Sequence, residues 1–212
     1  MEKLLINDIK GILEKLKDVM VENRDYLIEI DGVMGDSDLG LTMSAAFTAA
    51  SDLAVDYSDD DIGSLLSKAG MAMAKAAPST MGTLMGTGFM RGGKALKGKS
   101  EIGLQDLYLF WDAFMTGLLD RGKAKIGDKT INDSLYPAVL VLKEESDSNS
   151  ELYPAFQNAL KAAEEGVEKA TAMQAQFGKA AYYGEKSRGK IDPGSIVGKL
   201  LIEVFTDYFK KQ

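Results

Sequence analysis

The chain has 212 residues, of which 45% are hydrophobic, and its 32 acidic and 25 basic side chains give a formal net charge of −7. This acidity argues against a nucleic-acid-binding surface as the main purpose, and the hydrophobic content is sufficient for a large folded core. Cysteine and histidine are absent, which excludes zinc fingers, disulfide frameworks, cysteine nucleophiles and Ser-His-Asp triads. The N-terminus lacks the apolar core of a signal peptide, and no apolar run is long enough to span a bilayer. We therefore expect a cytoplasmic protein with neither membrane nor nucleic-acid partners.

Apolar periodicity predicts a helical protein. From Leu5 to Val19, apolar side chains recur at spacings of three and four residues, as they do on one face of an amphipathic helix. Similar patterns return over residues 41–56, 61–76, 82–97, 104–119, 130–144, 151–173 and 195–210. Only residues 26–30 could form a strand, and they are isolated. The sequence therefore predicts an all-α fold of about eight helices.

Polar residues indicate where some of these helices begin. Asp61, Ser150 and either Asp192 or Ser195 are the expected N-caps. The polar stretch over residues 144–150 is short enough to be a loop between consecutive helices, so no strong linker divides the chain. We expect one domain covering residues 1–212.

The segment from Asp31 to Gly40 carries three carboxylates among glycines, those of Asp31, Asp36 and Asp38. On a helix, Asp36 and Asp38 would point about 200° apart, whereas a glycine-flanked loop can turn both inward. Carboxylates crowded in this way repel one another unless a cation lies between them, and Mg²⁺ prefers oxygen ligands. The residues alone leave a second interpretation open, in which Asp36 or Asp38 caps the next helix and Asp31 is a solvated turn residue.

Residues 78–83 (Pro-Ser-Thr-Met-Gly-Thr) lie between two predicted helices and offer hydroxyls and free N–H groups at a helix start. This arrangement suits phosphate, although an ordinary capped helix junction explains it as well. Glycines recur at positions 82, 86, 88, 92 and 93, and either close helix packing or backbone approach to a ligand would account for them. Residues 88–95 nearly match a P-loop, but Ala95 replaces the hydroxyl residue that would hold Mg²⁺, so we reject that motif.

Two later segments combine charge with glycine. Residues 121–130 place four cations and two glycines in ten positions, which suits either neutralisation of phosphates or a solvated basic loop. Residues 173–194 form a long loop, and loops of this length usually have a function. At its end, Asp192 either accepts sugar hydroxyls or is simply the N-cap of the last helix.

Together these segments resemble the L subunit of dihydroxyacetone kinase, the nucleotide-binding component, over essentially the whole chain. The order and spacing of three segments carry the resemblance, namely residues 31–40, 121–137 and 173–194. The resemblance implies a closed barrel of about eight antiparallel helices, with the nucleotide site at one end. It also implies ADP or ATP as cofactor and two Mg²⁺ ions held by Asp31, Asp36 and Asp38.

The same resemblance implies the remaining contacts to the nucleotide. They are Leu39, Gly40, Leu41, Thr42, Ser79, Thr80, Met81, Gly122, Ile131, Lys179, Asp192, Pro193 and Gly194. No catalytic residue is assigned to this chain. Leu39 stands where the family usually has histidine, so a phosphate contact from an imidazole is missing. Gln176 and Phe177 likewise replace a basic pair.

The implied activity is phosphoryl transfer to dihydroxyacetone, or to a similar small ketose, held covalently on a histidine of a separate K-type subunit. An M-type phosphotransferase-system subunit would rephosphorylate the bound ADP from phosphoenolpyruvate. Alternatives are an ATP-dependent kinase subunit for another short ketose, a nucleotide-loaded regulatory module that docks on a transcriptional regulator, and a plain structural helical protein. The sequence is compatible with a homodimer and does not decide the oligomeric state.

Overall fold

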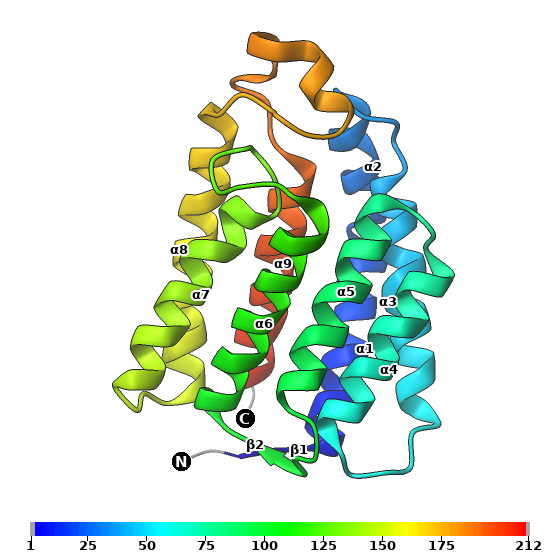
Figure 1. Cartoon of the computed structure of the whole chain (residues 1–212), viewed down its shortest axis with the longest axis vertical. Helices are drawn as coiled ribbons and strands as arrows, with labels where there is room; N and C mark the ends of the chain where they lie inside the picture. Colours follow the sequence, from blue (N-terminus) through cyan, green and yellow to red (C-terminus); the bar gives the residue numbers. More distant parts are fainter. Residues whose placement is uncertain (1–2, 211–212) are drawn as a thin grey trace.

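The computed structural model describes residues 3–210, and helices make up most of that range (Figure 1). The helices are α1 (Ile6–Glu22), α2 (Arg24–Gly32), α3 (Leu39–Val55), α4 (Ile62–Ala76), α5 (Thr80–Ala95), α6 (Leu104–Gly122), α7 (Asn132–Asp147), α8 (Leu152–Ala172), the 3-10 helix η1 (Lys179–Ser187) and α9 (Pro193–Phe209). Two short strands, β1 (Leu4–Leu5) and β2 (Glu101–Ile102), pair antiparallel. The predicted all-α class is confirmed, and within the described range no helix is both long and apolar enough to cross a membrane.

The isolated segment 26–30, which could have formed a strand, lies within α2, so the strand interpretation is wrong. An isolated strand leaves its backbone N–H and C=O groups without partners, whereas a helix satisfies most of its own. Asp61 and Asp192 cap α4 and α9 as expected, each carboxylate accepting a backbone N–H three residues on, at 2.9 and 2.6 Å. The N-cap of α8 is Glu151 instead of the expected Ser150, whose hydroxyl donates to Glu145.

Eight of the described helices pack side by side in a ring. Starting at α1, the order is α3, α4, α5, α6, α7, α8 and α9, and α9 contacts α1 again. α2 packs on α3, and in Figure 1 it lies with η1 at one end of the molecule, whereas β1 and β2 lie at the other. The ring surrounds one continuous hydrophobic core to which all eight helices contribute.

Aromatic side chains in the core fix the spacing between helices. Phe89 of α5 contacts Phe47 of α3 and Phe114 of α6 edge to face, at centroid distances of 5.9 and 5.6 Å. Trp111 of α6 contacts Phe205 of α9 across the ring at 5.3 Å. Such pairs contribute about 0.5–1.5 kcal/mol each beyond their buried area. These contacts join α5 to α3 and α6, and α6 to α9, within the core.

Close helix packing explains the glycines of α5. A Cβ at Gly86 would lie 2.6 Å from the carbonyl oxygen of Gly70 in α4, and a Cβ at Gly88 would lie 2.6 Å from the Phe114 ring. A Cβ at Gly93 would lie 2.5 Å from the backbone nitrogen of Ser67 in α4. These glycines let α4 and α6 approach the α5 backbone, so at these positions packing replaces the ligand-approach interpretation.

Replacing Gly86 by alanine is expected to lower the free energy of unfolding by about 2 kcal/mol or more, because the new methyl group would meet the backbone of α4. Gly117→Ala on α6 is the matched control. There the nearest atom is the Cδ of Arg91 at 3.0 Å, on a flexible side chain that can shift. We expect the control to be close to neutral. Urea unfolding followed by circular dichroism measures both variants, and equal losses of stability would contradict the packing argument.

Candidate functional site

A cavity of about 430 Å³ opens at the end of the ring where α2 and η1 lie. Residues at or next to the starts of four helices line it, namely Leu39 for α3, Thr80 for α5, Asn132 for α7 and Gly194 for α9. Helix N-termini present N–H groups and a partial positive charge. The convergence of four such ends on one cavity suits an anionic ligand, and the volume is in the range of ordinary ligand sites.

Asp31, Asp36 and Asp38 lie together on the wall of this cavity. Each offers one carboxylate oxygen, and the three atoms lie within 4.8 Å of one another. Asp38 occupies the N-cap position of α3, yet its side chain makes no capping hydrogen bond. The Asp31 carboxylate accepts the N–H groups of Asp38 (3.1 Å) and Leu39 (3.3 Å), so it is not a solvated turn residue. The geometry therefore favours the metal interpretation of this segment over capping.

The loop between α2 and α3 depends on glycine to bring Asp31 inward. A Cβ at Gly35 would lie 2.1 Å from the Oδ1 atom of Asp31, so no larger residue fits there. Ser37, between the other two aspartates, adopts a φ of +61°, in the left-handed region. The tight turn sets the carboxylates of Asp36 and Asp38 beside that of Asp31.

One lysine partly neutralises the three carboxylates. Lys179 of η1 donates to Asp36 over 2.5 Å, and this hydrogen bond lowers the pKa of Asp36 and raises the pKa of Lys179. The pKa of Asp38 is raised, first by partial burial and then by the charges of Asp36 and Asp31. Among the described residues, Lys179 is thus the cation that pairs with this group of three carboxylates. A divalent ion bound among them would replace the repulsion at Asp38 by attraction and lower its pKa.

Most of the residues expected to contact a nucleotide line the cavity, although they come from distant parts of the chain. These are Leu39, Ser79, Thr80, Met81, Gly122, Ile131, Lys179, Asp192, Pro193 and Gly194. The other three, Gly40, Leu41 and Thr42, continue α3 away from the cavity and are not part of its wall. Gly40 packs against α2, where a Cβ would lie 2.1 Å from the carbonyl oxygen of Arg24. Any contact from these three to a ligand stays a prediction.

The cavity also has an apolar wall that sequence analysis did not identify. It includes Leu84 and Leu118, beside the expected Met81 and Ile131. Leu84 follows Thr80 by four positions and Leu118 precedes Gly122 by four, so helical periodicity could have placed them on the same faces as the expected residues. An apolar wall of this kind suits a flat aromatic group.

Asn132 contributes an unsatisfied polar atom to the same part of the protein. The residue is 3% exposed and lines the cavity, and its Oδ1 atom is buried without a hydrogen-bond partner in the part of the chain that the structure describes. Buried acceptors are rarely left unpaired.

The basic segment 121–130 divides into exposed cations and one buried cation. Arg121, Lys123 and Lys125 are exposed, as a solvated basic loop predicts. Lys129 is only 3% exposed and its ammonium group donates to three backbone carbonyls, so neither interpretation offered for the segment describes it. Desolvation lowers the pKa of Lys129. Burial among backbone acceptors could not be read from the local sequence, because the carbonyls belong to remote segments.

Asp133 holds the same loop from the other side. Its residue is 4% exposed, and its two carboxylate oxygens accept the N–H groups of Gly127 (2.5 Å) and Thr130 (2.7 Å). Charge-assisted hydrogen bonds of this kind are stronger than neutral ones. The loop that carries Thr130 and Ile131 to the cavity wall is therefore rigidly built.

Asp192 combines capping with an unusual protonation equilibrium. Although the residue is partly exposed on the cavity wall, its carboxylate is enclosed by protein, and this burial raises the pKa of Asp192 to about 7. The N–H of Ser195 and the charge of Lys129 oppose the shift, whereas Asp133 and Asp31 add to it. The capping interpretation is correct, and a sugar contact is still compatible with its place on the wall.

The family model described as "DAK2 domain" matches residues 33–207. The chain is 33% identical over 183 residues to a protein of Escherichia coli strain K12 named "PEP-dependent dihydroxyacetone kinase, ADP-binding subunit DhaL", with 86% of this chain and 87% of that protein covered. It is also 32% identical over 209 residues to the "L-erythrulose 1-kinase" of Mycolicibacterium smegmatis, covering 96% of this chain and 36% of that protein.

Among solved structures, the chain is similar to the dihydroxyacetone kinase from C. freundii in complex with AMP-PNP and Mg²⁺. The TM-score is 0.71 at 22% sequence identity, and the match covers 94% of this chain and 33% of that one. At this identity the likeness concerns the fold. The chain thus spans about a third of that longer kinase.

The stability of the ligand-free protein is expected to depend on the protonation of Asp192. Because its folded pKa of about 7 lies above the ordinary 3.8, the protonated form stabilises the fold at low pH, and this contribution is lost as the pH rises through about 7. Asp192→Asn keeps a capping oxygen but cannot ionise. Between pH 4.5 and 7.5 the free energy of unfolding of the Asp192→Asn variant should fall less steeply than that of the unmodified protein. The difference between the two slopes should be up to about 1 kcal/mol per pH unit. Parallel urea titrations measure this, and identical pH profiles would contradict it.

Proposed function

The chain belongs to the DAK2 domain family, and from this premise we propose that it is the ADP-binding subunit of a phosphoenolpyruvate-dependent dihydroxyacetone kinase. The observation that carries the proposal is the meeting of three carboxylates, four helix N-termini and an apolar wall around one cavity. Each part matches one portion of Mg-ADP: metal, phosphates and base. The near-complete mutual coverage with the Escherichia coli subunit supports an L-type role for this chain.

In this proposal Asp31, Asp36 and Asp38 hold two Mg²⁺ ions against the phosphates. The first turns of α3 and α5, with Ser79, face the phosphates, and Gly122 and Ile131 border the base beside the apolar wall. Lys179 and the segment from Asp192 to Gly194 complete the site. The ring of helix contacts supports a closed antiparallel barrel with this site at one end, formed as a single domain over residues 1–212.

The residues of this chain supply positioning and charge compensation. Phosphoryl transfer passes through a loose transition state that needs little covalent chemistry from the protein, so aligned metals and cations supply most of the catalysis. The chain contains no histidine, and the ketose would be held by a separate K-type subunit. An M-type subunit would return a phosphoryl group to the bound ADP. We place the complex in the cytoplasm.

A second candidate is a kinase subunit for a different short ketose. The match to an L-erythrulose 1-kinase at 32% identity favours it, because the nucleotide domain would be common to both activities. Leu39, 6% exposed at the start of α3, also places an apolar side chain where the family usually has histidine. The end of the site that would face the phosphates therefore differs from that of the usual family member. The two candidates differ in the partner subunit and the sugar, and both use the same nucleotide site.

Asp38→Asn is expected to weaken Mg-ADP binding at least 100-fold, because one anionic ligand of the metals is lost. The same change removes a charge that its neighbours repel, so the stability of the ligand-free protein should rise slightly or stay the same. Asp52→Asn, at an exposed position on α3, is the matched control and should leave the affinity unchanged. Calorimetric titration with Mg-ADP measures the affinity. Unchanged binding by the Asp38 variant would remove the assignment of the metal site.

Catalysis is expected only from the assembled system. A cognate K-type subunit with dihydroxyacetone, the phosphoenolpyruvate phosphotransferase components and this protein should together yield dihydroxyacetone phosphate. Omission of this protein, or its replacement by Asp36→Ala, should abolish the product. L-erythrulose offered in a parallel reaction separates the two candidates. Failure with every small ketose, despite tight Mg-ADP binding, would contradict the kinase proposal.

A further inference from the structure

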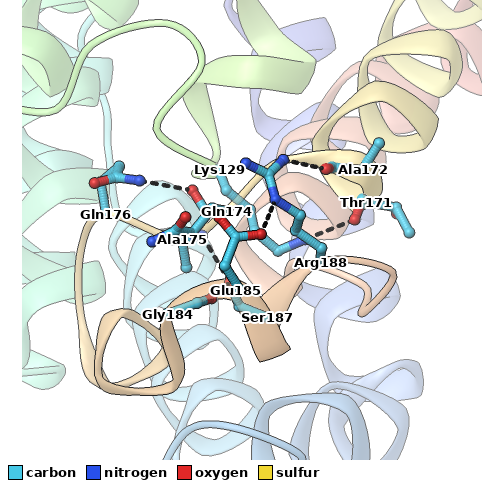
Figure 2. A network of polar contacts seen from close by, with 10 residues as sticks. All are labelled: Lys129, Thr171, Ala172, Gln174, Ala175, Gln176, Gly184, Glu185, Ser187 and Arg188. Carbon is cyan, nitrogen blue, oxygen red and sulfur yellow. Dashed lines mark hydrogen bonds and ion pairs between the residues drawn. The ribbon is translucent and has the colours of Figure 1, made fainter.

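The ammonium group of Lys129 joins three segments that are remote in sequence. Figure 2 shows one of its contacts, the hydrogen bond to the carbonyl oxygen of Thr171. It donates to the carbonyl oxygens of Ala170 (2.8 Å) and Thr171 (3.1 Å) at the C-terminal end of α8, and to that of Lys190 (2.6 Å) just before α9. Lys129 itself has a φ of +62°, and both Lys129 and the next residue, Thr130, line the cavity, although the ammonium group of Lys129 is directed to backbone carbonyls. The side chain is thus an internal cross-link between the cavity wall, α8 and the chain that leads into α9.

A cation is well matched to this position. The carbonyl oxygens of Ala170 and Thr171 already accept the N–H groups of Met173 (3.1 Å) and Gly189 (2.8 Å), and the ammonium group uses their remaining lone pairs. The last carbonyls of a helix carry a partial negative charge, so a buried ammonium group also neutralises them. Hydrogen bonds from a charged donor are roughly twice as strong as neutral ones. Burial lowers the pKa of Lys129, and the charge of Arg188 lowers it further, whereas the charges of Asp192 and Asp133 favour the charged form.

The segment over residues 173–191 depends on polar contacts of this kind. Only Ala175 and Ser187 within it are buried, so apolar packing contributes little to its position. Arg188 donates to the carbonyl of Ala172 (3.0 Å) and to Glu185 (2.6 Å), and the Ser187 hydroxyl accepts the N–H of Ala175 (2.9 Å), as Figure 2 shows. All of these contacts lie close to the end of α8 that Lys129 binds.

Both ends of this segment carry residues of the proposed nucleotide site. Lys179 lies near its start and forms the ion pair with Asp36, and Asp192 follows it directly. Lys190, whose carbonyl accepts from Lys129, is two residues before Asp192. The Lys129 contacts thus lie two residues from Asp192, through Lys190, and eight residues from Lys179, through Thr171.

We propose that Lys129 is a positioning residue for the nucleotide site, which fixes the segment 173–191 on α8 so that Lys179 and Asp192 face the bound nucleotide. The inference rests on the proposed Mg-ADP site and adds to it a residue whose ammonium group binds only backbone carbonyls. Because the segment is already held in place, less conformational entropy is lost when the nucleotide binds.

A double-mutant cycle tests this role. Lys129→Met keeps the aliphatic stem and removes the three hydrogen bonds, and Lys179→Met removes the cation that the segment presents. We expect Lys129→Met to weaken Mg-ADP binding at least 10-fold in calorimetric titrations. In the Lys179→Met background the same change should cost less than about 3-fold, because the two residues act through one segment. Lys125→Met, exposed on the same loop, is the matched control and should leave the affinity within about 2-fold in both backgrounds.

Hydrogen exchange gives a second readout. In Lys129→Met, amides of residues 174–191 should exchange faster, whereas those of α3, α4 and α5 should keep their protection. If that variant does not fold, Lys129→Gln, which keeps a neutral donor, is expected to show the same pattern at smaller amplitude.

Three results would overturn the proposal: reduced global stability with unchanged Mg-ADP affinity, affinity losses that add across the cycle, or unchanged exchange over residues 174–191. Absence of Mg-ADP binding by the unmodified protein would instead refute the proposed function, and the exchange comparison would still decide whether Lys129 orders the segment.

Discussion

The crowding of the Asp31, Asp36 and Asp38 carboxylates at one end of the ring is the constraint on which the candidate site depends. Three carboxylate oxygens within 4.8 Å of one another are unfavourable unless positive charge lies near them. Three features supply it: the ion pair from Lys179, the N–H groups that donate to Asp31, and the N-terminal ends of several helices. Each of these sources of positive potential comes from a different part of the chain. The helix ring is what brings them to one end, so the site and the fold cannot be separated.

Compensation by protein groups alone is incomplete. The pKa of Asp38 stays raised, and the pKa of Asp192 is about 7, so Asp192 is only partly ionised near neutral pH. The ligand-free site therefore holds unfavourable negative charge. A divalent cation with a polyphosphate would relieve the repulsion and use the helix N-termini at the same time. In the proposed function, part of the binding free energy would come from relief of this repulsion.

Some buried side chains near the cavity stabilise the loops that form its wall. Asp133 and Lys129 are buried, oppositely charged and bonded to backbone, and they brace the loop that ends at Ile131. A site assembled from loops needs such supports, because loops lack the repeating hydrogen bonds of helices. The two side chains supply hydrogen bonds to backbone groups that the loop itself does not make.

Apolar periodicity was enough to predict the all-α class and eight of the ten described helices, because it depends on neighbours within a few residues. Polar residues marked the cap at Asp61 and gave Asp192 as one of two candidates for the cap of α9. The spacing of the acidic segment likewise pointed to its three carboxylates. The helical state of residues 26–30 follows from backbone hydrogen bonding and was missed by the apolar pattern. Only tertiary structure decided the buried partners of Lys129 and the meeting of Leu84 and Leu118 on one cavity wall. The carbonyls that Lys129 binds belong to residues 170, 171 and 190, and the two leucines lie on different helices, so no local pattern could bring these groups together.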